Sequence, residues 1–175
     1  MPLNGTRRYG NNNKQCRRCQ HTNETLPHVL CHCTTKLTAI TRRHNAILDR
    51  LERAYRAPAG TEVRKNQTVP GTDSPLRPDL VITNDVERTC HIIDVATPFE
   101  NRYEAFQQAR AEKLNKYAGI ASTMREKGYE VTVDAFIVGA LGGWDPVNEN
   151  VIRKLGLGHK YSSLMKKLMV TDAIR

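Results

Sequence analysis

Cysteine and histidine are concentrated in one short segment, which limits what the N-terminal part of the chain can fold into. Four of the five cysteines fall within residues 16–33, and three of the six histidines lie among them. The segment has too few apolar residues to form a hydrophobic core, so it needs a cross-link or a bound ion. The first residues contain no apolar run typical of a signal peptide, and we therefore expect a reducing compartment, where disulfides are rare.

The spacing of this cluster is typical of a zinc site. Cys16 and Cys19 form a CxxC pair, and His28 and Cys33 provide a second half with four residues between them. Other combinations are also sterically conceivable, namely His28 with Cys31, and Cys33 with His21 or His32. We predict a structural Zn²⁺ in a small knuckle that depends on the metal for its fold.

Basic charge is concentrated at the same end of the chain. The formal net charge is +9, with eleven Lys and Arg against three Asp and Glu in residues 1–60, but sixteen against fifteen in residues 61–175. Cationic side chains that neutralise phosphates release counterions, which favours a nucleic-acid partner over a merely solubilising charged tail. We expect nucleic-acid contacts from Arg7, Arg8, Lys14, Arg17, Arg18, Arg42, Arg43 and Arg77.

Apolar periodicity after the knuckle predicts an α/β fold. We expect a short strand within residues 61–76, strands at 79–82, 90–96 and 131–138, and helices at 36–56, 104–127, 145 to about 156 and about 161–170. This order gives a mixed sheet flanked by helices. His44 lies on the apolar stripe of the first helix, and we interpret it as a core histidine. The longest apolar run, residues 135–144, is too short for a membrane span.

Two aspartates lie in the strands of the predicted hairpin. If the hairpin closes symmetrically about Val86 and Glu87, Asp79 lies opposite Asp94, with Cβ atoms roughly 5 Å apart. Two carboxylates this close repel each other and weaken the sheet unless a cation lies between them. Oxygen ligands suit a hard divalent cation, so the pair predicts a site for Mg²⁺ or Mn²⁺.

The helix at 104–127 adds a lysine and a tyrosine to this pair. Lys113 lies near the centre of the apolar stripe of the helix, whereas Lys116 lies to one side. A charge on a packing face needs negative partners, and the two aspartates and a bound phosphate would supply them. Tyr117, one turn later, could support the lysine or the phosphate through its hydroxyl.

These residues, taken in order, resemble a known nuclease signature. Arg77-Pro78-Asp79, then Asp94, then Lys113-Leu114-Asn115-Lys116-Tyr117 resemble the PD-(D/E)XK, or restriction-endonuclease-like, motif. With the preceding CCHC knuckle and Arg43-His44-Asn45, the chain resembles the C-terminal part of R-two-type site-specific LINE (non-LTR) retrotransposons, which insert into ribosomal RNA genes. The resemblance covers about residues 14 to 160.

The resemblance implies roles for particular residues. Asp79 and Asp94 would bind the catalytic metal, Lys113 would orient the attacking water, and Cys33 rather than Cys31 would be the fourth zinc ligand. The lysine that usually follows the second acid by two residues is Ala96 here, as in relatives whose lysine has moved to the next helix. Lys113 and Lys116 are both candidates for it. The implied domains are a basic arm with a zinc knuckle over residues 1–35 and a restriction-endonuclease-like domain over residues 36–175.

The function implied by the resemblance is metal-dependent nicking of double-stranded DNA in the nucleus. In such elements an attached reverse transcriptase, absent from this sequence, primes on the new 3′ hydroxyl, and the element RNA is a further partner. Two alternatives stay open at this point. The chain could be a catalytically silent nucleic-acid-binding module built on the zinc knuckle, or a nuclease that cleaves four-way junctions.

Overall fold

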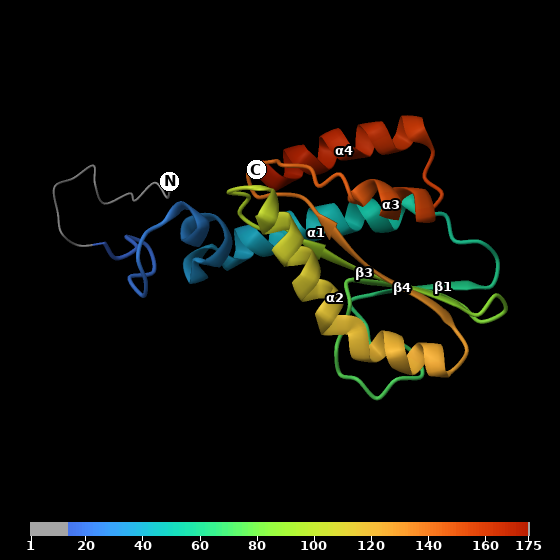
Figure 1. The fold of residues 1–175 in the computed structure, drawn as a ribbon. Helices are drawn as coiled ribbons and strands as arrows, with labels where there is room; N and C mark the ends of the chain where they lie inside the picture. The colour runs from blue at the N-terminus through green and yellow to red at the C-terminus, as the bar shows by residue number, and fades with distance from the viewer. Residues whose placement is uncertain (1–13, 175) are drawn as a thin grey trace.

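The sheet has four strands in the order in which they occur along the chain. The computed structural model describes residues 14–174, so Arg7 and Arg8 lie outside the described residues (Figure 1). The strands are β1 (Thr61–Lys65), β2 (Leu80–Asn84), β3 (Thr89–Ala96) and β4 (Glu130–Ile137). β1, β2 and β3 are antiparallel neighbours, whereas β3 and β4 are parallel and are joined through the long helix α2 (Tyr103–Glu126).

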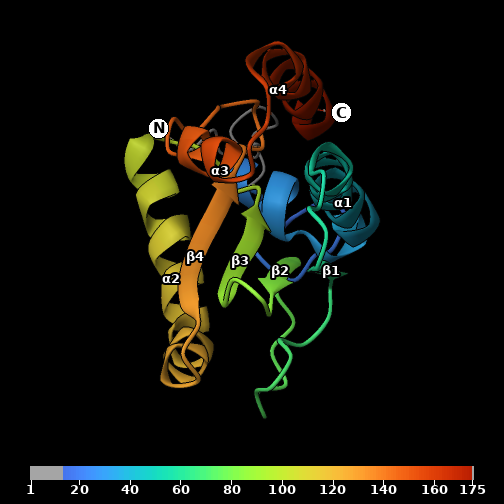
Figure 2. The same ribbon diagram turned by 90° about the vertical axis from the view of Figure 1, so that its right-hand side faces the viewer.

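Helices cover both faces of this sheet (Figure 2). On one face, α1 (Leu37–Ala54), α3 (Asn148–Lys154) and α4 (His159–Ile174) pack against a core that includes Leu80, Ile93 and Phe136. On the other face, α2 packs against Val81 and Ile92. The predicted mixed sheet flanked by helices is therefore confirmed. Within residues 14–174, no helix is both long enough and apolar enough to cross a lipid bilayer.

The register of the β2–β3 hairpin is the one predicted from its turn. Leu80 pairs with Ile93 and Val81 with Ile92, so continuing the ladder by one residue brings Asp79 beside Asp94. A slip of one residue would have turned one of the two carboxylates to the opposite face of the sheet. The hairpin therefore delivers both acids to the face that α2 covers.

The start of α3 differs from the prediction. The sequence predicts that this helix begins at residue 145, but α3 begins at Asn148. Asp145 is held in a buried ion pair with Arg110 of α2, and its Oδ1 accepts a hydrogen bond from the backbone N–H of Val147 at 3.0 Å. The long-range ion pair and this local hydrogen bond fix residues 145–147 as a turn, so α3 starts at Asn148.

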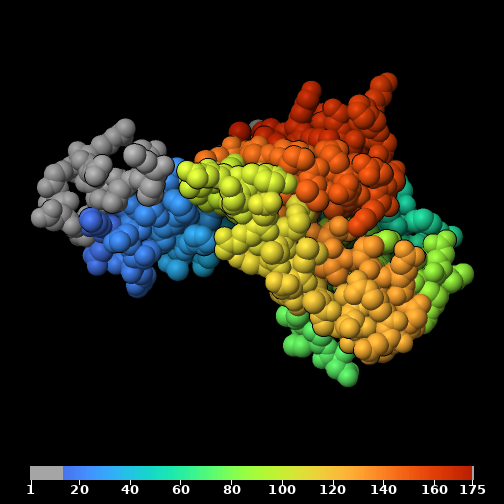
Figure 3. Space-filling view, in the orientation of Figure 1, coloured from blue at the N-terminus to red at the C-terminus, as the bar shows by residue number. Residues whose placement is uncertain are grey.

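The knuckle, residues 14–33, projects from one end of the body (Figure 3). A π-helical turn (His28–His32) and a 3₁₀ turn (Thr34–Lys36) lead from it directly into α1. Because these turns follow one another without a linker, the knuckle is joined closely to the N-terminal end of α1.

Candidate functional site

The knuckle brings together four side chains that could hold a metal ion. The ligand atoms of Cys16, Cys19, His28 and Cys33 all lie within 4.8 Å of one another. The Sγ atoms of Cys16 and Cys33 are 3.9 Å apart, and Cys19 Sγ is 3.3 Å from His28 Nε2. Neighbouring ligands of a tetrahedral Zn²⁺ lie roughly 3.5–3.8 Å apart, given the usual bond lengths. The predicted cluster is confirmed as one that could hold zinc.

Backbone hydrogen bonds shape the first half of this cluster. Cys16 donates its N–H to the carbonyl of Thr22 at 2.7 Å, and Gln20 closes the turn in the left-handed region with a φ of 56°. Hydrogen bonding from the backbone N–H of Cys19 lowers the pKa of the Cys16 thiol to about 6. Cys16 is therefore largely a thiolate at neutral pH, which is the form that binds zinc.

The π-helical turn explains why Cys33, and not Cys31, joins the cluster. Hydrogen bonds in a π-helix join residues five apart, so His28 and Cys33 come to the same side of the turn. Cys31 faces the body, where its thiol lies 3.7 Å from the carbonyl oxygen of Thr97 and 3.9 Å from Arg43 Nη2. The structure therefore selects Cys33 from the combinations that spacing allowed.

Single replacements of Cys31 and Cys33 should show which of the two cysteines binds zinc. We expect Cys33→Ser to lose most of the zinc, to below about one fifth of an ion per chain, because one of four ligands is gone from a site that the apo knuckle cannot preserve. Cys31→Ser should keep about one ion per chain. Elemental analysis of purified protein measures both, and equal zinc content in the two variants would contradict the assignment.

The acidic site forms where β2 and β3 bring Asp79 and Asp94 together. The backbone N–H of Asp79 donates to Asp94 Oδ1 at 3.3 Å, and the N–H of Val95 donates to Asp79 Oδ2 at 2.7 Å. Only 9% of Asp79 and 3% of Asp94 is exposed to solvent. Two adjacent carboxylates are thus buried at one end of the sheet, as the hairpin register predicted.

Helix α2 places a cation and a hydroxyl on the second acid. Lys113 Nζ lies 2.5 Å from Asp94 Oδ2, and the Tyr117 hydroxyl donates to Asp94 Oδ1 at 2.5 Å. Tyr117 is fully buried, and burial, reinforced by Asp94, raises the pKa of its hydroxyl well above the ordinary value, so it stays a donor. Lys116 instead lies over the Tyr117 ring, 4.8 Å from its centroid. The helical phase that favoured Lys113 is confirmed.

His44 is a member of this site that sequence reasoning missed. Its Nε2 lies 3.0 Å from Asp79 Oδ2, and 26% of its side chain is exposed, so the interpretation as a core histidine is wrong. The hydrogen bond with Asp79 raises the pKa of His44. Its place on the apolar stripe of α1 showed only that it faces inward, and nothing in the local sequence connects α1 with residue 79.

No protein-family model matches the chain, and no curated protein matches it.

Two of the basic residues predicted to contact nucleic acid make contacts within the protein. Arg43 turns inward and donates from Nη2 to the carbonyl of Leu30 at 2.8 Å, which fastens the knuckle to α1. Arg17 pairs with the buried carboxylate of Glu24 across the knuckle hairpin and lowers the pKa of Glu24. These two arginines therefore have structural contacts that the sequence did not suggest. The remaining described members of the set are exposed, namely Lys14, Arg18, Arg42 and Arg77.

Proposed function

We propose that this chain is a metal-dependent DNA endonuclease that nicks its target, as the endonuclease part of a site-specific retrotransposon. The observation that carries the proposal is the meeting of Asp79, Asp94 and Lys113 at one end of the sheet. A single lysine cannot neutralise two buried carboxylates, and His44 compensates Asp79 only when it is protonated. The arrangement is therefore costly for a purely structural cluster.

The donor set fits a hard divalent cation. Asp79 and Asp94 offer carboxylate oxygens on one face of the sheet, the ligand type that Mg²⁺ and Mn²⁺ prefer. Zinc would favour the thiolates and imidazole of the knuckle instead. The two clusters thus differ in the metals that they would select. When bound, Mg²⁺ or Mn²⁺ would polarise the phosphoryl group and lower the pKa of a coordinated water.

The protein's own side chains would hold the acids and the phosphate in place. Tyr117 fixes the orientation of Asp94 through its hydroxyl, and the N–H of Val95 fixes that of Asp79. Lys113 brings a positive charge beside Asp94, where it could hold the attacking water or a non-bridging phosphate oxygen. Because all of these groups sit on the sheet or on α2, the site is preorganised before substrate arrives.

DNA binding and DNA cleavage would use different parts of the chain. The exposed cations of the knuckle and of α1, together with Arg77 beside the first acid, would contact phosphates of double-stranded DNA. In this proposal the chain works in the nucleus with an attached reverse transcriptase that primes on the new 3′ hydroxyl, and the element RNA is a further partner.

Plasmid nicking tests the proposal directly. We expect the zinc-loaded chain to convert supercoiled plasmid to open circles in Mg²⁺ or Mn²⁺, and to leave it intact in Ca²⁺ or after removal of divalent ions. Binding with a steep salt dependence but no cleavage in either metal would contradict the nuclease assignment and favour a silent binding module. Faster cleavage of four-way junctions than of linear duplex would instead identify a junction nuclease.

A further inference from the structure

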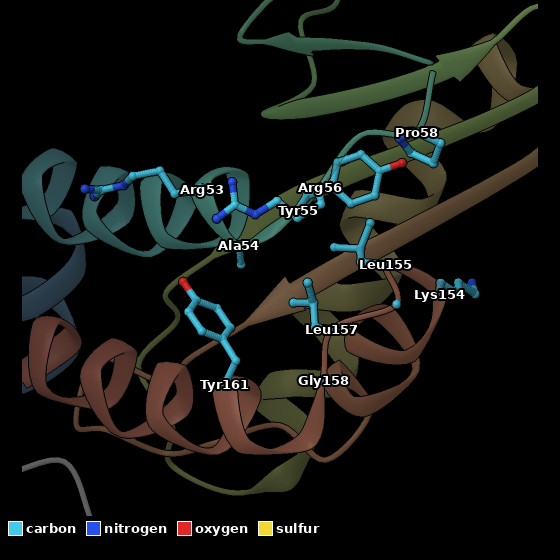
Figure 4. Close-up of a pocket in the computed structure, with 11 residues that line it drawn as sticks. Arg53, Ala54, Tyr55, Arg56, Pro58, Lys154, Leu155, Leu157, Gly158 and Tyr161 are labelled. Atoms are coloured by element: carbon cyan, nitrogen blue, oxygen red, sulfur yellow. The ribbon is translucent and has the colours of Figure 1, made fainter. Parts of the chain in front are cut away.

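A pocket lies at the C-terminal end of α1, away from the acidic site. It is a pocket of about 540 Å³ between the last turn of α1 with the loop that follows it, the end of α3 and the start of α4 (Figure 4). His44, which contacts Asp79 of the acidic site, and Ala54, which lines the pocket, are ten residues apart on α1, or about 15 Å along the helix axis. The pocket is therefore separate from the acidic site but within reach of the same bound polymer.

The walls of this pocket are aromatic and aliphatic. Figure 4 shows the Tyr161 ring directed from the first turn of α4 toward Ala54, and the Tyr55 ring beside Pro58. Half of Tyr161 is exposed, although its ring adjoins the hollow. Two glycines, Gly156 and Gly158, have no neighbour within 4 Å of an added Cβ, so the α3–α4 turn leaves the opening wide. The remaining apolar lining residues are Leu155 and Leu157.

The charge at the rim of the pocket is positive. Arg53, Arg56 and Lys154 line it, and among the described residues no acidic side chain does. Lys154 is paired with Asp134 at 2.8 Å, and Arg53 donates through Nε to the carbonyl of Asp49. Arg56 is exposed and makes no ion pair within residues 14–174. The pocket therefore presents an unpaired guanidinium next to open aromatic surface.

We propose that this pocket binds a nucleotide of single-stranded nucleic acid, with the base against Tyr161 and the phosphate at Arg56. Aromatic rings take up bases that are not stacked in a duplex, and a concave pocket admits a base only after it has left its stack. An acidic peptide would meet the cation but has no planar group to cover the rings. The inference rests on the proposed function because it takes nucleic acid to be the partner of the chain.

Amide resonances of the zinc-loaded, ¹⁵N-labelled full chain can locate the ligand, with a short oligodeoxythymidylate as the probe and no Mg²⁺ present. We expect saturable shifts in the amide resonances of residues 54–57 and 155–161. We expect Tyr161→Ala and Arg56→Glu each to weaken binding at these resonances by about tenfold, since one stacking or phosphate contact is lost. Tyr161→Phe should bind nearly as well as wild type because the ring is kept.

Matched variants separate a built site from a general electrostatic field. Arg153 is an exposed arginine of α3 that does not line the pocket, and Tyr103 is as exposed as Tyr161 but lies at the start of α2. Arg153→Glu and Tyr103→Ala should each change the affinity less than twofold. Equal weakening by Arg153→Glu and Arg56→Glu would overturn the proposal, and so would shifts confined to the knuckle.

Three further outcomes test this inference, and the last two distinguish it from the proposed function. An oligoglutamate peptide that shifts the pocket resonances while the oligonucleotide does not would overturn the inference and identify an acidic protein segment as the ligand. Plasmid nicking by wild type without any oligonucleotide shift in the pocket would overturn the inference alone. Pocket shifts without nicking would support the inference and refute the nuclease.

Discussion

Nicking of supercoiled plasmid in Mg²⁺ is expected to fall about 10³-fold in both Asp79→Asn and Asp94→Asn. Charge stabilisation by a bound divalent cation is worth several kcal/mol in the transition state, and about 4 kcal/mol corresponds to roughly 10³-fold in rate. Each substitution removes one of the two carboxylates that would hold the cation. Initial rates at saturating DNA measure the effect.

Asparagine is chosen because it keeps most of the hydrogen bonds at both positions. In Asp79→Asn the side-chain carbonyl can still accept a hydrogen bond from the N–H of Val95. In Asp94→Asn the side-chain carbonyl can still accept a hydrogen bond from the Tyr117 hydroxyl. Only the charge and one acceptor oxygen are lost. We therefore expect cooperative thermal unfolding and an unchanged circular dichroism spectrum in both variants, so that a loss of nicking reports on chemistry.

Asp134→Asn is the matched control for this experiment. Asp134 is also a strand carboxylate paired with a lysine, Lys154, but its neighbours along β4 show that it faces away from α2. The nicking rate of the Asp134→Asn variant should stay within twofold of wild type. Undiminished nicking in both acidic-site variants, or an equal loss in Asp134→Asn, would remove Asp79 and Asp94 from the catalytic machinery.

The parts of the site that could be predicted depend on local geometry. A symmetric turn fixes the register of a hairpin, so the sequence around Val86 and Glu87 was enough to bring Asp79 beside Asp94. Helical periodicity likewise fixes which side chains of one helix share a face, which is why Lys113 could be separated from Lys116. Each of these two predictions needed only one hairpin or one helix, whose residues are close together in the sequence.

The parts that could not be predicted depend on how distant elements pack. His44 reaches Asp79 only because α1 lies across the far face of the sheet with its N-terminal turns beside the end of β2. Arg43 turns inward because the knuckle docks against that same turn of the helix. The helix predicted from residue 145 starts later because Asp145 pairs with Arg110, thirty-five residues away in the chain. No local pattern contains these contacts.

Removing the lysine amine at position 113 should have the next largest effect. We expect Lys113→Met to lower the nicking rate by about 10²- to 10³-fold, within the range for a positioned acid–base group. Methionine retains much of the apolar stem of the lysine, so the loss is mainly that of the ammonium group beside Asp94. Affinity for duplex DNA, measured without divalent metal, should change less than threefold, because most phosphate contacts are assigned to the knuckle, α1 and Arg77.

Lys116→Met removes a lysine from the same helix and provides the comparison. Lys116 is exposed and lies over the Tyr117 ring instead of on a carboxylate, so its loss should leave the nicking rate within twofold of wild type. Lys113→Arg adds a further test, since it keeps the charge but replaces the compact ammonium group with a planar fork. If positioning beside Asp94 matters, arginine should restore less than about one tenth of the wild-type rate. A severe loss of nicking in Lys116→Met together with normal nicking in Lys113→Met would contradict this assignment. It would identify Lys116 as the catalytic lysine.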